Sequence, residues 1–464
     1  MAVGAALEAA RAQVGVLAGR VAELERRLGR DSSTSSKPPS ADSPYRKKPR
    51  DRSLRGRSGR GPGKQPGAKS VTLRQAADPD EVIVCAPAAC AGCGGGLGGA
   101  VVTGVARLQE FEIVPPPRPR VTEYQVQARV CSRCGMVCAG TPQARMTGRA
   151  QYGPGVHAQA ANLVCASYVP VTRAAQLMAD VAGVPVSAGF IAGVRGKAAA
   201  RLDPFMARVR ELLRAAGVLY ADETPARAAS GLRYLHVACT GYLTAMHAGD
   251  RSAASIDAGG VLPGYGGVIV RYGYGGYSHL TDALHAWCGA HNLRDLRDLY
   301  TADPVRQAWA QEMARVLLCA NAAAAAARAA GQPHLSTGQL AEIGDWYDAA
   351  VSNGIHDNTA RASQTCRDGL RLARRFAASQ DMILRFTTDL AIGFTSNQAE
   401  RDIRPVKVQQ RSSGGCWRTL QGLADFAVVQ SYLSTAAKWG IPKLDALRQL
   451  FTTGPWLPPA TTPP

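Results

Sequence analysis

The amino-acid sequence predicts a multidomain α/β protein, with a mixed β-sheet as its core and helical segments before and after it in the chain. With 464 residues, the chain is long enough for two or three domains that each bury their own core. After residue 215 comes a series of segments rich in β-branched and aromatic residues, which predicts strands. A helical, alanine-rich stretch follows from about Pro304 to Ala378. This succession of strands and helices indicates a mixed sheet.

The charge balance indicates a partner that is rich in phosphate or acidic groups. The formal net charge is +19 and the pI is about 9.7. No uninterrupted apolar run is long enough to cross a bilayer, which favours nucleic acid over a membrane. The first residues, MAVGAALEAARAQVG, lack the basic region, apolar core and cleavage site of a secretory signal. We therefore expect a cytoplasmic protein.

The N-terminal segment, residues 1–30, predicts a short coiled coil. Apolar side chains recur there in a heptad pattern, at Leu7, Val14, Leu17, Val21, Leu24 and Leu28. Glu25 and Arg27 flank this seam as the charged e and g positions of a coiled coil do. We expect the seam to join two copies of the chain, and a lone amphipathic helix packed on the protein is the alternative.

Residues 31–76 predict a disordered basic linker. The run DSSTSSKPPSADSP is too polar and proline-rich to bury a core. From Arg46 to Arg74, eleven Lys or Arg residues stand against one acid, a net +10. Such a segment attracts a phosphate backbone without recognising bases, because binding releases counterions. Candidate DNA contacts are Arg46, Lys47, Lys48 and Arg50; a solvated linker without function is the alternative.

Residues 77–145 predict a zinc-binding domain. The motifs CAGCG and CSRCG are separated by two strand-like segments, ARLQEFEIVPP and VTEYQVQARV. Four thiolates in paired Cys-x-x-Cys motifs can enclose a tetrahedral Zn²⁺ at about 2.3 Å per sulfur, with no open coordination position, which makes the metal structural. The predicted ligands are Cys90, Cys93, Cys131 and Cys134. Cys85 and Cys138 lie outside the motifs and are treated as ordinary cysteines.

Residues 150–215 predict a helical region that could bind DNA. A helix is expected from Thr172 to Val181, Gly183 breaks it, and Ser187 can cap a second helix that continues through FIAGVRGKAAARL. Two helices joined by a short glycine-bearing turn have the form of a helix-turn-helix, whose second helix enters the major groove. Because helical hairpins are commoner in purely structural roles, the motif supports DNA binding only together with the basic charge.

The segment GVLYADETPARA predicts the first central strand and places Asp222 where that strand ends. GLRYLHVACTGYLTAMHAG predicts two further strands, and GGVIVRYGYGGY another. Chemistry in α/β sheets lies at strand ends, although a single Asp there is commonly only a cap. Its significance therefore depends on the other acids of the chain.

The C-terminal part contains a second candidate acid in the segment SNQAERDIRPVK. In a helix, Glu400 and Arg404 lie one turn apart, so a carboxylate and several cations project side by side. They could form a simple surface salt bridge. Phosphoryl transfer is the sharper alternative, with an acid to hold a metal and cations to bind phosphates. The candidate DNA contacts in this part are Arg401, Arg404, Lys407, Arg411 and Arg418.

These motifs together identify a resemblance. The order DSSTSSKPPSAD, basic Gly/Pro arm, double Cys-x-x-Cys, DETPAR, GYGGYSHL, HAWCGAHNLRDL, SNQAERDIRPVK and PWLPP resembles the insertion-sequence sixty-six family of bacterial transposases, over essentially the whole chain. The resemblance implies a ribonuclease-H-like core, residues 216–300 and 386–464, that a helical insertion over 301–385 interrupts. It also implies cutting and joining of DNA ends by two Asp and one Glu with two Mg²⁺ (or Mn²⁺) ions, in a nucleoid-associated protein that can require companion proteins of its element.

Carried over by position, Asp222 corresponds to the first acid of the family and Glu400 to the third. The second acid belongs in a segment that resembles Val-Arg-Asp-Gly-Tyr, where this chain has Val-Arg-Tyr-Gly-Tyr, so Tyr272 stands at the aspartate position. Cys288 and His291 match the Cys-x-x-His element that follows and fix the alignment.

Loss of this acid predicts an impaired enzyme. Two-metal catalysis needs two ions about 3.5–4 Å apart, and carboxylates hold them. A tyrosine phenol, with an unperturbed pKa of about 10, is neutral at working pH. We expect Asp222 and Glu400 alone to bind at least one ion weakly and strand cleavage to fall by orders of magnitude. Asp282, expected in a following helix, could substitute only by reaching across a packed sheet, and we do not expect it to do so.

Three hypotheses follow. The chain is a DNA transposase that works with a substitute acid, or a derivative without catalysis that binds the element ends. A zinc-containing transcription regulator would leave the DETPAR and NQAER segments unexplained, and we rank it last.

Overall fold

The computed structural model describes residues 13, 21, 73–112, 119–141, 148–359 and 363–461. The chain forms two compact units, residues 48–117 and residues 1–47 with 118–464. Apart from residues 13 and 21, the predicted coiled coil lies outside the described residues, as do Arg46, Lys47, Lys48 and Arg50. No helix within the described ranges has the length and apolar character needed to cross a membrane.

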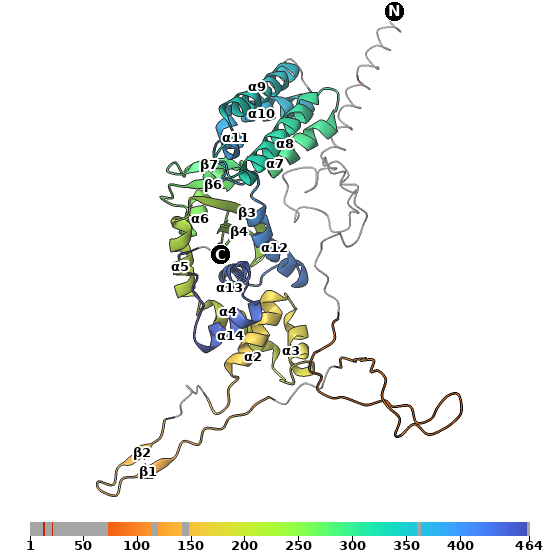
Figure 1. The fold of residues 1–464 in the computed structure, drawn as a ribbon. Helices are drawn as coiled ribbons and strands as arrows, with labels where there is room; N and C mark the ends of the chain where they lie inside the picture. Colours follow the sequence, from red (N-terminus) through yellow and green to blue (C-terminus); the bar gives the residue numbers. More distant parts are fainter. Residues whose placement is uncertain are drawn as a thin grey trace, which may run out of the picture. The chain divides into compact units, whose positions relative to one another are not determined.

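The core of the larger unit is a five-stranded mixed sheet, in the order β5-β4-β3-β6-β7 (Figure 1). β3 pairs antiparallel with β4, which pairs antiparallel with β5, whereas β3, β6 and β7 run parallel. The strands span Val218–Ala228 (β3), Gly231–Cys239 (β4), Thr244–Gly249 (β5), Val268–Arg271 (β6) and Leu284–Trp287 (β7). A separate two-stranded ladder joins β1 (Ala128–Val130) to β2 (Val137–Ala139). The mixed sheet confirms the predicted α/β class.

The sheet corrects the expected end of the first strand. β3 does not stop at Asp222 but continues to Ala228, because β4 pairs with it along its whole length. The hairpin turn between them consists of Ala229 and Ser230, both with positive φ, at 49° and 62°. Neither residue is the Asn, Asp or Gly that marks such a turn in a sequence. The hairpin therefore cannot be recognised from the sequence, and the predicted strand is too short.

The helices before the sheet confirm the expected hairpin. The Ser187 side chain accepts a hydrogen bond from the Phe190 backbone N–H at 3.1 Å and caps the second helix as predicted. The elements are α2 (Pro154–Ala161), the π-helical turn η2 (Asn162–Ala166), α3 (Val171–Asp180), α4 (Ala188–Ala199) and α5 (Asp203–Arg214). The outer face of α4 includes Ala188, Gly189, Ala192 and Gly193, none of which carries a side-chain hydrogen-bond donor.

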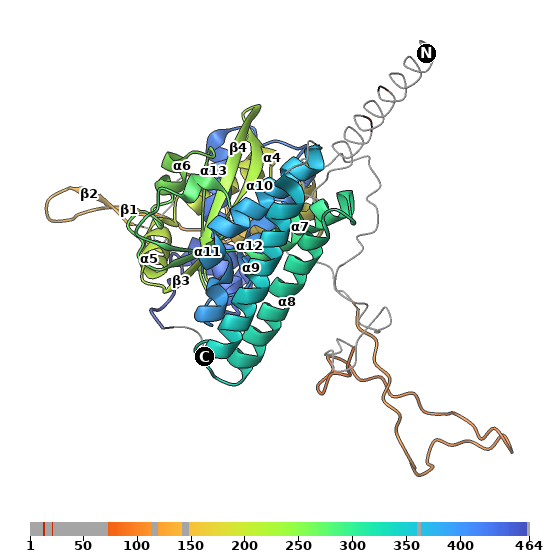
Figure 2. The same ribbon diagram turned by 90° about the horizontal axis from the view of Figure 1, so that it is seen from above.

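Helices α8, α9, α10 and α11 form the expected insertion between the last strand and the Glu400 helix. α8 and α9 pack side by side, and α10 packs on α9 (Figures 1 and 2). They span Ala308–Ala329 (α8), Thr337–Thr359 (α9), Gln364–Ala378 (α10) and Gln380–Thr388 (α11). The other elements are α6 (Ala253–Ala258), the 3-10 turn η3 (Gly275–Tyr277), α7 (Gly289–Ala302), α12 (Asn397–Ser412), α13 (Leu420–Lys438) and α14 (Lys443–Thr452).

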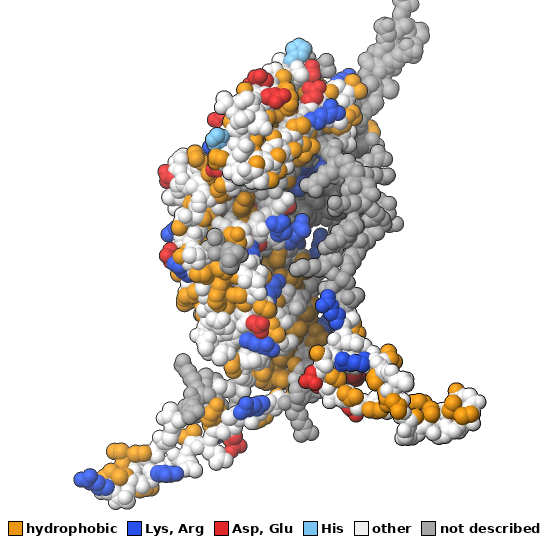
Figure 3. All heavy atoms as spheres, viewed as in Figure 1, with side chains coloured by type: hydrophobic (Ala, Val, Ile, Leu, Met, Phe, Trp, Pro, Cys, Tyr) orange, Lys and Arg blue, Asp and Glu red, His pale blue; other side chains and the backbone are white. Residues whose placement is uncertain are grey.

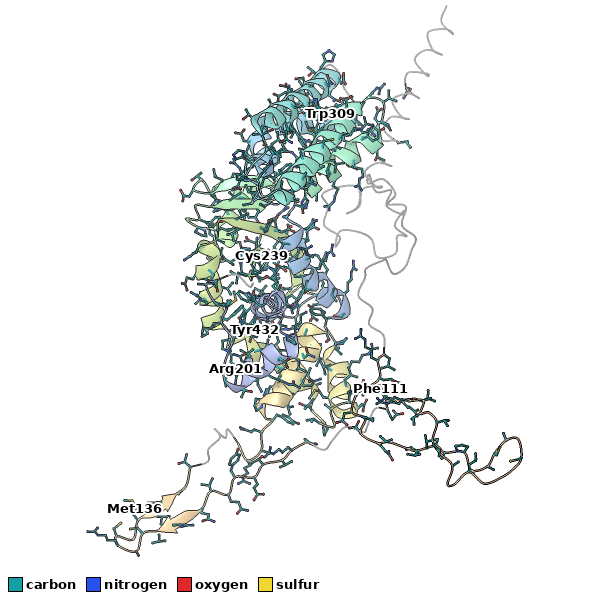
Figure 4. The ribbon with its side chains drawn as sticks, in the orientation of Figure 1. Phe111, Met136, Arg201, Cys239, Trp309 and Tyr432 are labelled. Carbon is teal, nitrogen blue, oxygen red and sulfur yellow. The ribbon has the colours of Figure 1, made fainter. Side chains whose placement is uncertain are left out.

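Three clusters of buried side chains hold these elements together. Tyr432 belongs to the cluster that α2 to α5 form with α13 and α14, Trp309 to the core of the insertion, and Cys239 to the cluster between the sheet and α12 (Figure 4). Each of the three side chains is fully or almost fully buried. The third cluster fixes α12 against β3 and β4, which determines where Glu400 lies.

Candidate active site and DNA-facing residues

Asp222 lies in the middle of β3, beside α12. Its side chain is half-buried, and Oδ1 accepts a hydrogen bond from the Glu223 backbone N–H at 2.9 Å. Burial raises the pKa of Asp222 to about 7; His291 opposes this shift, and the carboxylates of Glu223 and Glu400 add to it. Because burial and the neighbouring carboxylates disfavour the ionised form of Asp222, a cation that binds next to it would stabilise that form.

The neighbouring acid, Glu223, has a different role. Its carboxylate accepts hydrogen bonds from the Arg251 guanidinium at 2.8 Å and from the Tyr277 hydroxyl at 2.9 Å. The Glu223 side chain is 5% exposed, whereas that of Arg251 is 41% exposed, so only the carboxylate side of this ion pair is shielded from water. Successive residues of a strand point to opposite faces, which separates Glu223 from Asp222.

Glu400 lies in the first turn of α12. Its Oε1 is 3.9 Å from His291 Nε2 and 3.8 Å from Arg294 Nη2, both on α7. The Glu400 side chain is 26% exposed, which leaves it accessible to a ligand. Its charge is one of the effects that raise the pKa of Asp222.

Asp402, two residues further along the same helix, is not accessible to a ligand. It forms a buried ion pair with Lys438 at 2.6 Å and accepts hydrogen bonds from Thr244 Oγ1 and Ser434 Oγ, each at 3.0 Å. This network ties α12 to β5 and α13. Of the two acids in SNQAERD, only Glu400 therefore remains for chemistry.

Tyr272 follows the last residue of β6. β3 and β6 pair with Val218 opposite Val268 and Tyr220 opposite Val270, so the same register, continued by two residues, sets Tyr272 level with Asp222. The Tyr272 ring packs on the His291 ring, with 4.7 Å between centroids. His291 thus lies between Tyr272 and Glu400.

Cys288 joins the ends of two elements beside this site. Its buried thiol accepts a hydrogen bond from the Ser396 backbone N–H at 3.2 Å, at the start of α12. Although burial raises it, hydrogen bonds with His291 and Ser396 bring the pKa of Cys288 down to about 7. The pKa of His291 is raised: burial lowers it, but hydrogen bonding with Cys288 outweighs this. Through the hydrogen bond from Ser396, Cys288 ties the start of α7 to the start of the Glu400 helix.

Asp282, the acid considered as a substitute, lies away from this site. Asp282 is exposed in a turn before β7, not in a helix. It precedes the first residue of β7, whereas Tyr272 follows the last residue of the parallel strand β6. The two residues thus belong to opposite ends of the parallel pair, and Asp282 cannot replace the missing carboxylate without large movement.

The predicted cations of α12 differ in exposure. Arg401, Arg404 and Arg411 are exposed, and basic side chains are visible over α12 in Figure 3. Lys407 is half-buried and donates a hydrogen bond to the Pro225 carbonyl of β3, and burial lowers its pKa to about 8. Arg418, also exposed, follows the helix. The sequence argument missed Arg294, whose only signal was its position three residues after His291.

The donor set fits one hard cation better than two. In the described ranges, no group of three or more His, Cys, Asp or Glu side chains is placed to hold a metal ion. Mg²⁺ commonly binds through one or two carboxylates together with water and substrate phosphates, which Asp222 and Glu400 could provide. A second ion would lack the carboxylate that the aspartate position normally supplies.

The two cysteine motifs form the same turn, each within its own unit. The Gly94 N–H donates to the Cys90 carbonyl and the Gly135 N–H to the Cys131 carbonyl, at 2.9 and 2.8 Å. Both glycines have positive φ, near 74° and 73°, which explains why glycine follows each motif. Backbone hydrogen bonds from Cys93 and Gly92 lower the pKa of the Cys90 thiol, and those from Arg133 and Cys134 lower the pKa of the Cys131 thiol. The geometry within each motif suits a pair of ligands.

The fold and site define an α/β protein with one carboxylate, Asp222, on a mixed sheet and another, Glu400, on the helix α12 that packs on this sheet, beside exposed cations. The family model described as Transposase IS66 family matches residues 149–424, more than half of the chain, and the chain therefore belongs to this family. Its function is DNA transposition, its partner is DNA, and transposases of this DDE type generally use divalent metal ions. A model for a family of unknown function, DUF6444, matches residues 4–74. No curated protein matches the chain.

Proposed function

We propose that this transposase has a ribonuclease-H-like core in which Asp222 and Glu400 hold a divalent metal ion, and that Tyr272 strongly lowers its strand cleavage and transfer. The observation that carries the proposal is the meeting of Tyr272, His291 and Glu400 beside Asp222. The five-stranded mixed sheet supports the proposed core.

The residues of the site have distinct proposed roles. A bound Mg²⁺ or Mn²⁺ would supply Lewis-acid activation of a phosphoryl oxygen and of the attacking water or hydroxyl. Asp222 and Glu400 would provide its negative charge. Arg294 lies beside Glu400, where it can balance the charge of a DNA phosphate. Tyr272 contributes a phenol where a carboxylate is needed, so the site has one carboxylate too few to hold two ions.

DNA binding without catalysis is the second candidate function. The exposed arginines of α12 and the accessible cysteine motifs do not depend on Tyr272, so end binding could persist in a cleavage-deficient copy. A structural zinc ion on Cys90, Cys93, Cys131 and Cys134, dimerisation through residues 1–30, a cytoplasmic, nucleoid-associated location and a need for companion proteins belong to this proposal in either case.

The two functions are separated by nicking assays on the element's own end DNA with Mg²⁺ or Mn²⁺. We expect the natural chain to cut poorly and the Tyr272→Asp variant to cut at least about a hundredfold faster, because restored carboxylate binding is worth several kcal/mol. The control is Tyr272→Asp combined with Asp222→Asn, which should be inactive. Equal cutting by the natural chain and Tyr272→Asp would show that the second metal ligand is another residue.

A further inference from the structure

The helical insertion carries opposite charges on two neighbouring helices. α9 has four acids and no Lys or Arg, with its acids at Glu342, Asp345, Asp348 and Asp357. α10, packed on α9, has four arginines and one acid, Asp368, with its arginines at Arg367, Arg371, Arg374 and Arg375. Acidic side chains gather at the upper end of the bundle in Figure 3, where Figure 1 places α9. The charge of the insertion is thus divided between two sides.

The arginines of α10 form one face of the helix. Arg367, Arg371 and Arg375 are spaced four residues apart, which stacks them on the same side over about 12 Å, and Arg374 adjoins them. Arg367, Arg371 and Arg374 are exposed, and the Arg371 side chain is 75% exposed. Arg371 pairs with Asp368 of its own helix at 2.6 Å and Arg375 with Asp295 of α7 at 2.5 Å, and the side chains of α10 together carry a net charge of +3.

The C-terminal end of this arginine face lies beside the candidate active site. Arg375 forms an ion pair with Asp295 of α7 at 2.5 Å, one residue after Arg294. Its guanidinium also lies over the Trp287 ring, 5.6 Å from the centroid, at the end of β7. A side chain added at Gly273 would meet that same Trp287 ring at 3.3 Å, and Gly273 directly follows Tyr272. The Trp287 ring therefore lies between the Arg375 guanidinium and Gly273, the residue after Tyr272.

The spacing of the arginines suits a DNA backbone. Phosphates along one strand of B-DNA rise about 3.4 Å each, so a face of about 12 Å spans three or four of them. Guanidinium groups bind phosphate oxygens through charge-assisted hydrogen bonds. The acids of α9 would repel the same backbone. We therefore expect DNA to approach the insertion from the side of α10.

We infer that the arginine face of α10 (Arg367, Arg371, Arg374 and Arg375) binds the phosphate backbone of duplex DNA next to the carboxylates, with Arg294 continuing the contact on α7. The inference rests on DNA being the partner and extends the proposed site into the insertion. The contact is with phosphates and not with bases, so it contributes affinity and positioning without sequence preference.

Salt-dependent DNA binding tests this surface. The probe is a short fluorescent duplex of arbitrary sequence, titrated with the full chain between about 50 and 200 mM salt. For Arg367→Gln with Arg371→Gln, we expect the slope of log affinity against log salt to fall in magnitude by about 2, because each lost phosphate contact removes about 0.9. Arg374→Gln alone should lower it by about 1.

Further variants test whether a change in the slope comes from the lost charges of α10. Arg306→Gln is the control, because Arg306 is also exposed in the insertion and also pairs with an aspartate three residues away, at 3.7 Å; its slope should not change. Lysines at 367 and 371 should retain most of the slope. An unchanged slope in both glutamine variants would overturn the inference while leaving DNA binding intact. A lower slope together with an inactive Tyr272→Asp variant would support the surface and refute the proposed role of Tyr272.

Discussion

At the scale of single residues, the structure assigns opposite roles to acids that are almost adjacent in the chain. Glu223 is bound by Arg251 and Tyr277, whereas Asp222 faces α12 and α7. Strand geometry explains this separation, because neighbouring side chains point to opposite faces. Glu400 and Asp402 show the same division of roles on a helix.

We predict that Asp402→Asn destabilises the chain and Glu400→Gln does not. Asp402→Asn would leave the Lys438 ammonium, whose side chain is 10% exposed, without its counter-ion. Breaking a buried pair from one side costs about 3–5 kcal/mol, whereas a partly exposed substitution changes stability by about 0.5 kcal/mol. Urea unfolding of both variants measures the difference. Similar stabilities for the two would contradict the structural role of Asp402.

At the scale of elements, β4 and β5 hold a stacked pair of histidines. The rings of His236 and His247 are 4.8 Å apart, and their Nε2 atoms bind the carbonyls of Asp250 and Ser255. Burial, together with the neighbouring His236, lowers the pKa of His247 to about 4, and burial also lowers the pKa of His236. Both rings are therefore neutral in the folded chain at neutral pH.

Acid should weaken this part of the sheet. Between the ordinary pKa of 6.5 and the folded value of about 4, the unfolded chain binds a proton that folded His247 does not, so stability is full above pH 6.5 and falls as pH decreases toward 4. His236 acts in the same direction. We expect unfolding midpoints measured across this range to depend less on pH in His247→Gln. His356→Gln, at a side chain that is 90% exposed, is the control and should follow the natural chain.

At the scale of the whole molecule, the two cysteine motifs belong to different compact units. The sequence predicts that the four thiolates of these motifs bind zinc. Each motif forms the same glycine-ended turn, so each is prepared to supply two ligands.

We predict one zinc ion per chain, measured by elemental analysis of the purified protein. Cys90→Ser or Cys131→Ser should each reduce zinc well below one equivalent, because a structural tetrahedral site needs all four ligands. Cys85→Ser and Cys138→Ser, at exposed cysteines outside the motifs, should retain it. Full zinc content in Cys131→Ser would instead indicate a different ligand set.

The sequence by itself determined the features that depend only on residues close together in the chain. Ser187 caps a helix because its hydroxyl reaches a backbone N–H three residues away, and the glycine after each Cys-x-x-Cys permits a turn with positive φ. The ordered motifs of the chain also identified the family, which the matched model confirms. Local chemistry is sufficient for these predictions because the partners lie within one turn.

Only the tertiary structure decided which partner each functional group has. It extended β3 past Asp222, placed Asp282 at the other end of the parallel strands and showed that Asp402 pairs with Lys438. It also placed Arg375 over Trp287, at the end of β7. These contacts join residues that are far apart in the chain, and hydrophobic packing between elements determines them, so no local pattern of side chains records them.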